Sequence, residues 1–239
     1  MSKRLKFFLG HFTISLIIAL VVLYLIFYVW YPKPLDLALG VGNLTFMLLA
    51  IDLVIGPLFG WLVYKTGKKS LKFDLAVVIL LQMSALAYGF YTIAKGRPTW
   101  IVYDTAVFHI VRQSDIQSSH LHLAKGEYQK PSWLGPKIVA LQDLNNVTSK
   151  HPTPELIIEM EHPMYYADLI GAKTNFQNMA YPLDALKRFN DEGKIKPILN
   201  KYPEANSWIG LVGLQQDMVV LLNKEKAEVI KIVDLRPWN

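Results

Sequence analysis

The chain has 239 residues, of which 52% are hydrophobic and only 18% are charged, and its mean hydropathy is +0.25. Soluble domains carry about 25% charged residues on average, so this composition argues against a disordered chain and against a single cytosolic globule. Because the chain contains no cysteine, a disulfide scaffold, a zinc finger, an iron–sulfur site and a cysteine nucleophile are excluded.

The net charge of +6 is concentrated in one part of the chain. Residues 1–95 carry nine basic and three acidic side chains, whereas residues 96–239 carry sixteen of each. Nucleic-acid binding requires basic side chains gathered on a folded face, and the larger part is neutral. We therefore expect no nucleic-acid partner and interpret the basic excess as a signal of membrane topology.

Three stretches are apolar enough to cross a membrane as helices. The first, residues 7–31, would rise about 37 Å as a helix, which exceeds the roughly 30 Å of a hydrocarbon core. It is longer than the apolar part of a signal peptide and ends in bulky residues before Pro32 and Pro34, so we expect an uncleaved helix. The second and third stretches are residues 39–64 and 73–94.

Basic residues next to these stretches predict their orientation. One group precedes the first stretch, and the other separates the second from the third: Lys3, Arg4 and Lys6, then Lys65, Lys68, Lys69 and Lys72. The loop between the first two stretches offers only Lys33, beside Asp36. The positive-inside rule places both basic groups in the cytoplasm. We thus expect a transmembrane domain over residues 1–95 and a periplasmic domain over residues 96–239.

The second part of the chain predicts an α+β domain with a mainly antiparallel sheet. Residues 100–111 and 137–141 are rich in β-branched and aromatic residues, with a turn expected near Asp104. A helix is expected over residues 154–166. Residues 183–202 are expected to form two short helices, because Gly193 and Pro197 interrupt the helical pattern. Three further strands are expected at residues 208–214, 218–222 and 228–235, the last two joined by a polar hairpin turn.

Residues that could carry chemistry do not form a recognised pattern. His120 and His122 form an HxH pair, but the remaining histidines of this part do not complete a metal set by spacing: His109, His151 and His162. Glu159 and Glu161 are two residues apart and would point to different sides of a helix. No hydrolase, metalloprotease, phosphate-loop or dinucleotide motif occurs in the sequence. We expect neither an enzyme nor a bound cofactor.

Asp52 is the most informative residue of the apolar stretches. A carboxylate deep in a membrane helix costs about 2.5–3.5 kcal/mol on insertion scales and therefore normally faces protein. By depth, Asp52 lies level with Gln82 and Ser84 of the third stretch. Two interpretations follow: a hydrogen bond that holds the helices together, or a polar contact offered to the membrane helix of another protein.

Small residues near Asp52 allow the same two interpretations. Gly56 and Gly60 form a GxxxG motif, and Gly89 closes a second pair of small residues with Ala85. Such pairs let helix backbones approach closely, either within this chain or to a partner helix. Pro57 is expected to kink the second stretch and to free a carbonyl oxygen close to Asp52.

Long strings of the sequence resemble one known family. The strings are WYPKPLDLALG, AIDLVIGPLFGWLVYKTGKKSLKFDLAVVILLQMSALAYGFYTIAKGRPTWIVYD and VVLLNKEKAEVIKIVDLRPW. They are similar to those of the type IV pilin accessory proteins, the TfpX/TfpZ or fimbrial assembly protein family. The family-like positions are Asp52, Gly56, Pro57, Gly67, Lys68, Lys69, Asp74, Gln82, Gly89, Gly96, Arg97, Pro98, Asp234, Arg236 and Pro237.

The resemblance implies a bacterial inner-membrane protein that helps its cognate major pilin to be assembled into fibres. It would stabilise the pilin in the membrane, modulate its delivery to the assembly platform, or alter extension against retraction. Pilin and membrane lipids are then the expected partners, and the family supplies no catalytic residues. The alternatives are a small membrane transporter and a membrane-anchored sensor, both of which would use Asp52.

Overall fold

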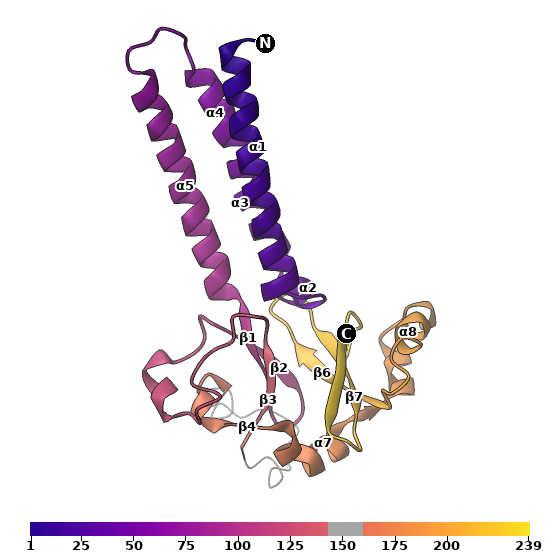
Figure 1. The fold of residues 1–239 in the computed structure, drawn as a ribbon. Helices are drawn as coiled ribbons and strands as arrows, with labels where there is room; N and C mark the ends of the chain where they lie inside the picture. Colours follow the sequence, from indigo (N-terminus) through magenta and orange to yellow (C-terminus); the bar gives the residue numbers. More distant parts are fainter. Residues whose placement is uncertain (143–159) are drawn as a thin grey trace. The chain divides into compact units, whose positions relative to one another are not determined.

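A computed structural model describes residues 1–142 and 160–239 and divides the chain into two compact units (Figure 1). The helical unit comprises Met1–Pro32 and Val41–Gly96, and the α+β unit comprises Lys33–Gly40 and Arg97–Asn239. The short segment Lys33–Gly40 therefore groups with the α+β unit, although it lies in the chain between two helices of the other unit.

The helical unit contains three continuous helices. They are built from α1 (Lys3–Tyr24) with η1 (Leu25–Trp30), from α3 (Val41–Ala50) with η2 (Ile51–Ile55) and α4 (Gly56–Val63), and from α5 (Leu71–Gly96). Each is long and apolar enough to cross a membrane. Ser2 caps α1 because its side chain accepts a hydrogen bond from the N–H of Leu5 at 3.2 Å. The three predicted apolar helices are confirmed, with ends that differ by a few residues.

Gly40 sets the start of the second long helix. It adopts a left-handed φ of +67° and ends the short helix α2 (Leu35–Leu39), so the next helix begins at Val41. Leu35 and Ala38 are buried in the core of the α+β unit, and the carbonyl of Ala38 accepts a hydrogen bond from the N–H of Gln215 at 2.9 Å. These contacts explain why the segment belongs with the α+β unit.

The α+β unit is built on a mixed sheet with the strand order β4-β3-β1-β2-β6-β7-β8, while β5 pairs with β6 beside this path. The strands are β1 (Pro98–Tyr103), β2 (Phe108–Arg112), β3 (Lys137–Leu141), β4 (Tyr166–Ala167), β5 (Tyr181–Pro182), β6 (Ser207–Val212), β7 (Met218–Asn223) and β8 (Glu228–Val233). The predicted α+β class is confirmed. The prediction of a mainly antiparallel sheet is wrong, because β1 pairs with β3 and β2 with β6 in parallel.

The parallel pairs join strands that are distant in the sequence, so no hairpin pattern predicts them. Local sequence patterns did predict the β1–β2 and β7–β8 hairpins. In the first, Asp104 Oδ1 accepts hydrogen bonds from the N–H groups of Ala106 and Val107 at 2.7 and 2.9 Å, which fixes the predicted turn.

Side chains of the central strands pack on both faces of the sheet. In β7, Met218, Val220 and Leu222 enter one cluster, whereas Val219 and Leu221 enter the other. A strand buried on both faces explains why the sequence of β7 is a continuous apolar run rather than an alternating one. The second cluster is completed by the short helices on that face.

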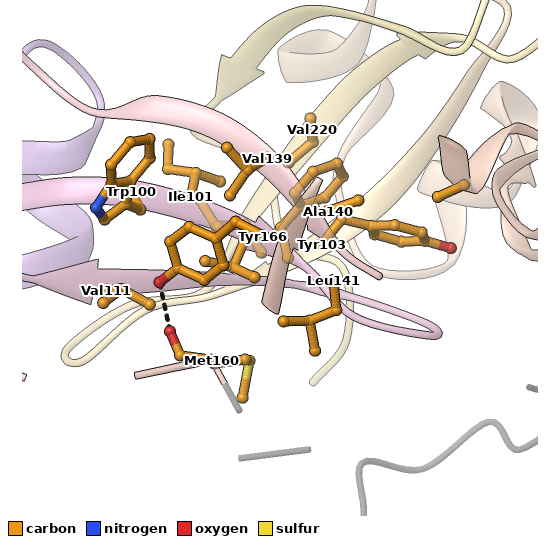
Figure 2. Packing of buried hydrophobic residues seen from close by; sticks show 14 of the residues in the cluster. Trp100, Ile101, Tyr103, Val111, Val139, Ala140, Leu141, Met160, Tyr166 and Val220 are labelled. Atoms are coloured by element: carbon orange, nitrogen blue, oxygen red, sulfur yellow. Dashed lines mark hydrogen bonds between the residues drawn. The ribbon is translucent and has the colours of Figure 1, made fainter. Parts of the chain in front are cut away.

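The larger cluster is aromatic, and its tyrosines are anchored by hydrogen bonds (Figure 2). The hydroxyl of Tyr166 donates to the carbonyl of Met160, and that of Tyr103 donates to Oδ1 of Asn175 at 2.7 Å. Burial raises the pKa of both tyrosine hydroxyls above the ordinary value, so both stay protonated donors. Large rings can be buried here because their polar ends have partners.

The helices of the α+β unit differ from expectation in two places. The two short helices expected over residues 183–202 are present as η7 (Leu183–Arg188) and α8 (Glu192–Leu199), but Gly193 and Pro197 lie inside α8. The break falls instead near Asn190, whose side-chain amide bonds the N–H and carbonyl of Arg236 at 2.7 and 2.8 Å. A long-range contact therefore sets this boundary.

The helix expected over residues 154–166 lies partly outside the described residues. Of its described residues Met160 is α-helical, and a single 3₁₀ turn, η5 (Pro163–Tyr165), then leads directly into β4, so the helix does not reach residue 166 as predicted. The remaining short helices within the described residues are η3 (Ser118–Leu123), η6 (Leu169–Ala172) and α7 (Lys173–Met179).

Candidate functional site

Asp52 lies in a π-helical turn whose geometry follows from Pro57. In η2 the hydrogen bonds run five residues back, and the N–H of Gly56 donates to the carbonyl of Ile51. The next N–H in this series would belong to residue 57, but proline has none. The carbonyl oxygen of Asp52 is therefore free of the helix ladder, at the place where the sequence predicted an unused carbonyl.

Gln82 of α5 satisfies this carbonyl and connects the three helices. Its Nε2 donates to the Asp52 carbonyl at 2.9 Å, to Asp52 Oδ1 at 2.6 Å and to Ser15 Oγ at 3.0 Å. Its Oε1 lies 2.8 Å from His11 Nε2, so this amide orientation makes the imidazole nitrogen the donor. We call His11, Ser15, Asp52 and Gln82 the polar cluster.

Two buried atoms of the polar cluster have no hydrogen-bond partner among the residues that the structure describes. They are Oδ2 of Asp52, a residue only 2% exposed, and Nδ1 of His11. An unpaired polar atom in an apolar environment is costly. The sequence pointed to Asp52 and Gln82, whereas Ser15 and the contact made by His11 were not foreseen, and Ser84 is exposed on α5.

The glycines near the polar cluster are covered by side chains of the same chain. A Cβ on Gly56 would lie 2.2–2.5 Å from the Gln82 amide, and one on Gly60 would lie 2.9 Å from the Phe7 ring. A Cβ on Gly89 would lie 2.5 Å from Leu48 Cδ1. All three positions thus pack helix against helix within this unit, which is the bundle-packing interpretation of these motifs.

The basic loop between α4 and α5 is exposed. Lys65, Lys68 and Lys69 of the loop and Lys72 in the first turn of α5 all lie at the surface, and Lys68 Nζ pairs with Asp74 Oδ2 at 2.5 Å. Gly67 supplies a left-handed φ of +84° for the turn. The loop therefore has the solvent exposure that its proposed role in topology requires.

The histidines and acidic residues considered in the sequence do not assemble in the described parts of the chain. His109 Nε2 lies 3.0 Å from Asp104 Oδ2, His122 is exposed, and the ring of His162 meets that of Tyr165 edge to face. His151, Glu159 and the side chain of His120 lie outside the described residues. Over residues 1–142 and 160–239, no group of three His, Asp or Glu side chains could hold a metal ion.

A cavity of about 430 Å³ in the α+β unit was not foreseen from the sequence. Its lining includes Tyr181 and Trp208, whose rings stack with centroids 5.0 Å apart, together with Phe189, Arg188 and Trp238. The walls come from segments far apart in the chain, so no local pattern could indicate it. It is an aromatic hollow beside a cationic side chain, suited in size to a side chain or a small group.

Comparison with known proteins gives the chain its family. The family of the fimbrial assembly protein FimB matches residues 1–40. Two curated relatives, the fimbrial assembly proteins of Dichelobacter nodosus serogroups I and E1, are each 31% identical over 142 residues, or 59% of this chain. The match covers 55% of each of these relatives, so this chain spans about half of their length. No solved structure matches.

A third relative is covered more fully. The fimbrial assembly protein of Dichelobacter nodosus serogroups C1 and C2 is 35% identical over 108 residues, which is 44% of this chain and 82% of that relative. The chain therefore belongs to the fimbrial assembly protein FimB family.

Proposed function

We propose that this chain, within the role in fimbrial biogenesis that its family indicates, binds its cognate major pilin in the bacterial inner membrane. There it would modulate pilin assembly or retraction and hand the subunit to the pilus assembly platform. The observation that carries this proposal is family membership, combined with three apolar helices that precede an α+β unit. A pilin has one apolar helix and a soluble head. The apolar helices of this chain could contact the pilin helix, and its α+β unit could contact the pilin head.

We further propose that the three helices cross the membrane with the N-terminus in the cytoplasm and the α+β unit in the periplasm. Residues 33–40 and 97–239 pack into one unit, so both must lie on the same side of a membrane. An even number of crossings between them, by Val41–Val63 and Leu71–Gly96, satisfies this condition. The exposed lysines of the α4–α5 loop support a cytoplasmic position for that loop.

Reporter fusions test this topology. A periplasm-active reporter after Asn239 should be active, whereas the same reporter inserted after Gly67 should be silent, and a cytoplasm-active reporter should give the reverse pattern. A C-terminal tail in the cytoplasm would refute the proposal.

For the pilin contact we propose the outward face of α5. Within the helical unit α5 buries only Leu86 and Ile93, and it exposes large apolar residues along its length, including Leu80 and Tyr88. The polar cluster and its glycines are already engaged by this chain, so we assign Asp52, Gly56, Pro57, Gly60, Gln82 and Gly89 to holding the bundle.

Photo-crosslinking in cells tests this contact. Crosslinkers at Leu80 and Tyr88 should capture pilin, whereas crosslinkers at Ile14 and Ile17 of α1, which are also exposed, should capture less. Identical patterns in membranes with and without pilin would contradict pilin binding.

The deciding genetic experiment deletes the chain and counts surface fimbriae and the membrane pool of pilin separately. Loss of both indicates that the chain stabilises pilin. A full pool with few fimbriae indicates that it acts on delivery or retraction. Unchanged fimbriae and an unchanged pool would refute a role in assembly.

A second candidate function, a small transporter, is favoured by one observation. His11 and Asp52 are linked through Gln82 in the interior of the helical unit, which places two ionisable side chains in one apolar bundle. Purified chain in liposomes should then conduct ions or protons, and Asp52→Asn should abolish the flux. If the chain supports pilin assembly but conducts neither ions nor protons, the transporter function is refuted and the assembly function stands.

A further inference from the structure

Apolar side chains of the α+β unit are exposed next to the points where this unit is joined to the apolar helices. Peptide bonds join the two units at Pro32–Lys33, Gly40–Val41 and Gly96–Arg97. If the three helices cross a membrane, residues bonded to their ends must lie at its surface. Side chains that contact Lys33–Gly40 or Arg97 are therefore held near the membrane–water interface by covalent connection.

Trp133 and Leu134 are fixed to one of these junctions. The guanidinium carbon of Arg97 lies 3.9 Å from the centre of the Trp133 ring, and Arg97 Nε donates to the carbonyl of Ser132 at 3.4 Å. Arg97 is itself buried and donates to Gln113 Oε1 at 2.9 Å. The loop that carries Trp133 is thus tied to the first residue after α5.

The geometry of this loop holds Leu134 outward. The N–H of Leu134 donates to Ser132 Oγ at 3.2 Å, and Gly135 supplies a left-handed φ of +91°. Leu134 is 86% exposed, the highest value among the large hydrophobic residues of the chain that the structure describes. A leucine fixed at the tip of a tight turn, beside an exposed tryptophan, is unfavourable in water.

Leu37 and Leu214 repeat this arrangement at the other junctions. Leu37 is an exposed residue of α2, within the segment Lys33–Gly40 that is bonded to both neighbouring helices. Leu214 is 68% exposed and precedes Gln215, whose N–H bonds to Ala38 and whose side chain covers Gly40. Both leucines therefore belong to, or lie next in sequence to a residue that contacts, the segment Lys33–Gly40.

We propose that these four side chains, Leu37, Trp133, Leu134 and Leu214, form an apolar rim that enters the interfacial layer of the lipid bilayer. Tryptophan is enriched at this depth, where its ring meets both apolar and polar groups. The rim seats the α+β unit on the membrane surface from which its helices emerge. This inference rests on the proposed membrane crossing and is independent of pilin binding.

The cysteine-free sequence permits a clean test on the full-length protein in lipid vesicles. Single variants Leu134→Cys and Leu214→Cys are labelled with an environment-sensitive fluorophore, and nitroxide lipids quench labels that enter the bilayer. Ile170→Cys is the matched control, because Ile170 is an apolar residue 71% exposed on η6, remote in sequence from the junctions. A label on Leu80→Cys in α5 tests whether this helix crosses the bilayer.

Labels at residues 134 and 214 should lose most of their emission to lipids with a nitroxide near the headgroup, and their spectra should shift to shorter wavelength. The label at residue 170 should be unaffected. Equal quenching at residues 134, 214 and 170 overturns the apolar rim. If the label at residue 80 resists nitroxides placed deep in the acyl chains, the membrane crossing fails as well, which separates the two proposals.

Discussion

The two units of the chain differ in where their large apolar side chains lie. In the helical unit, the buried polar residues Ser15, Thr45 and Asp52 lie in the interior, while most large apolar side chains point outward. In the α+β unit, the interior is filled with large rings such as Trp100 and Phe176. Burial of apolar surface stabilises the second arrangement in water, whereas the first suits lipid, where close packing and hydrogen bonds hold helices together.

The largest effect is expected in the aromatic core. Phe176→Ala removes a fully buried ring that contacts Tyr103 and Phe108 with centroids 5.1 and 6.1 Å apart. The free energy of unfolding of the α+β unit should fall by about 3–5 kcal/mol. Urea unfolding followed by near-ultraviolet circular dichroism measures this, and Ile170→Ala at an exposed site should change little. Equal effects would contradict the assigned core.

Packing at the glycines of the helical unit should give an intermediate effect. Gly56→Ala places a methyl group against the Gln82 amide and should destabilise the helices by about 1–3 kcal/mol. Gly10→Ala is the control, because nothing lies within 4 Å of its added Cβ, and alanine favours the helix there. Unfolding in mixed SDS micelles, followed by the helical circular dichroism signal, should shift in opposite directions for the two variants.

Removal of the hydrogen bonds of the polar cluster should cost somewhat less. Gln82→Leu leaves the Asp52 carbonyl and carboxylate without their donor, and the helical unit should lose about 1–2 kcal/mol. Ser84→Leu, at an exposed position on the same helix, should lose nothing in the same micelle assay. A double-mutant cycle with Asp52→Leu should be non-additive, since both residues share these bonds. Additive effects would disprove the coupling.

The smallest effect is expected from a surface ion-pair network of the α+β unit. Glu192 lies 3.0 and 3.1 Å from Lys187 and Lys196, and hydrogen bonds with these lysines lower the pKa of its carboxyl. Because the pKa of this carboxyl is lower in the folded state, the ion pairs stabilise the fold at pH values above the ordinary pKa of glutamate. This contribution is lost as the pH falls through the pKa of the folded state. The melting temperature should therefore exceed that of Glu192→Gln slightly at neutral pH and converge with it in acid.

Local patterns predicted much of the fold, and long-range contacts account for the rest. Hydropathy located the three long helices, and hairpin signals located β1–β2 and β7–β8. The parallel β2–β6 pair was missed because its strands are far apart in the sequence. The break near Asn190 depends on Arg236, which no local rule includes.

For the candidate site, depth along the helices predicted that Asp52 lies level with Gln82, and the rule for proline predicted an unused carbonyl nearby. Depth did not reveal Ser15, because serine in an apolar helix carries little signal by itself. The contact made by His11 was not predicted because it joins residues that lie 71 positions apart in the sequence. The aromatic cavity around Trp208 requires the folded sheet and could not be read from any one segment.

The burial of Leu35 and Ala38 has a consequence for biosynthesis. These residues leave the ribosome before any strand of the sheet, yet their core neighbours include Leu211 and Met218, which are made near the end of translation. The early segment must therefore wait uncovered until the last strands arrive. A chain truncated before β6 would keep both side chains accessible, so quality-control proteases could recognise a missing C-terminus at a site close to the N-terminus.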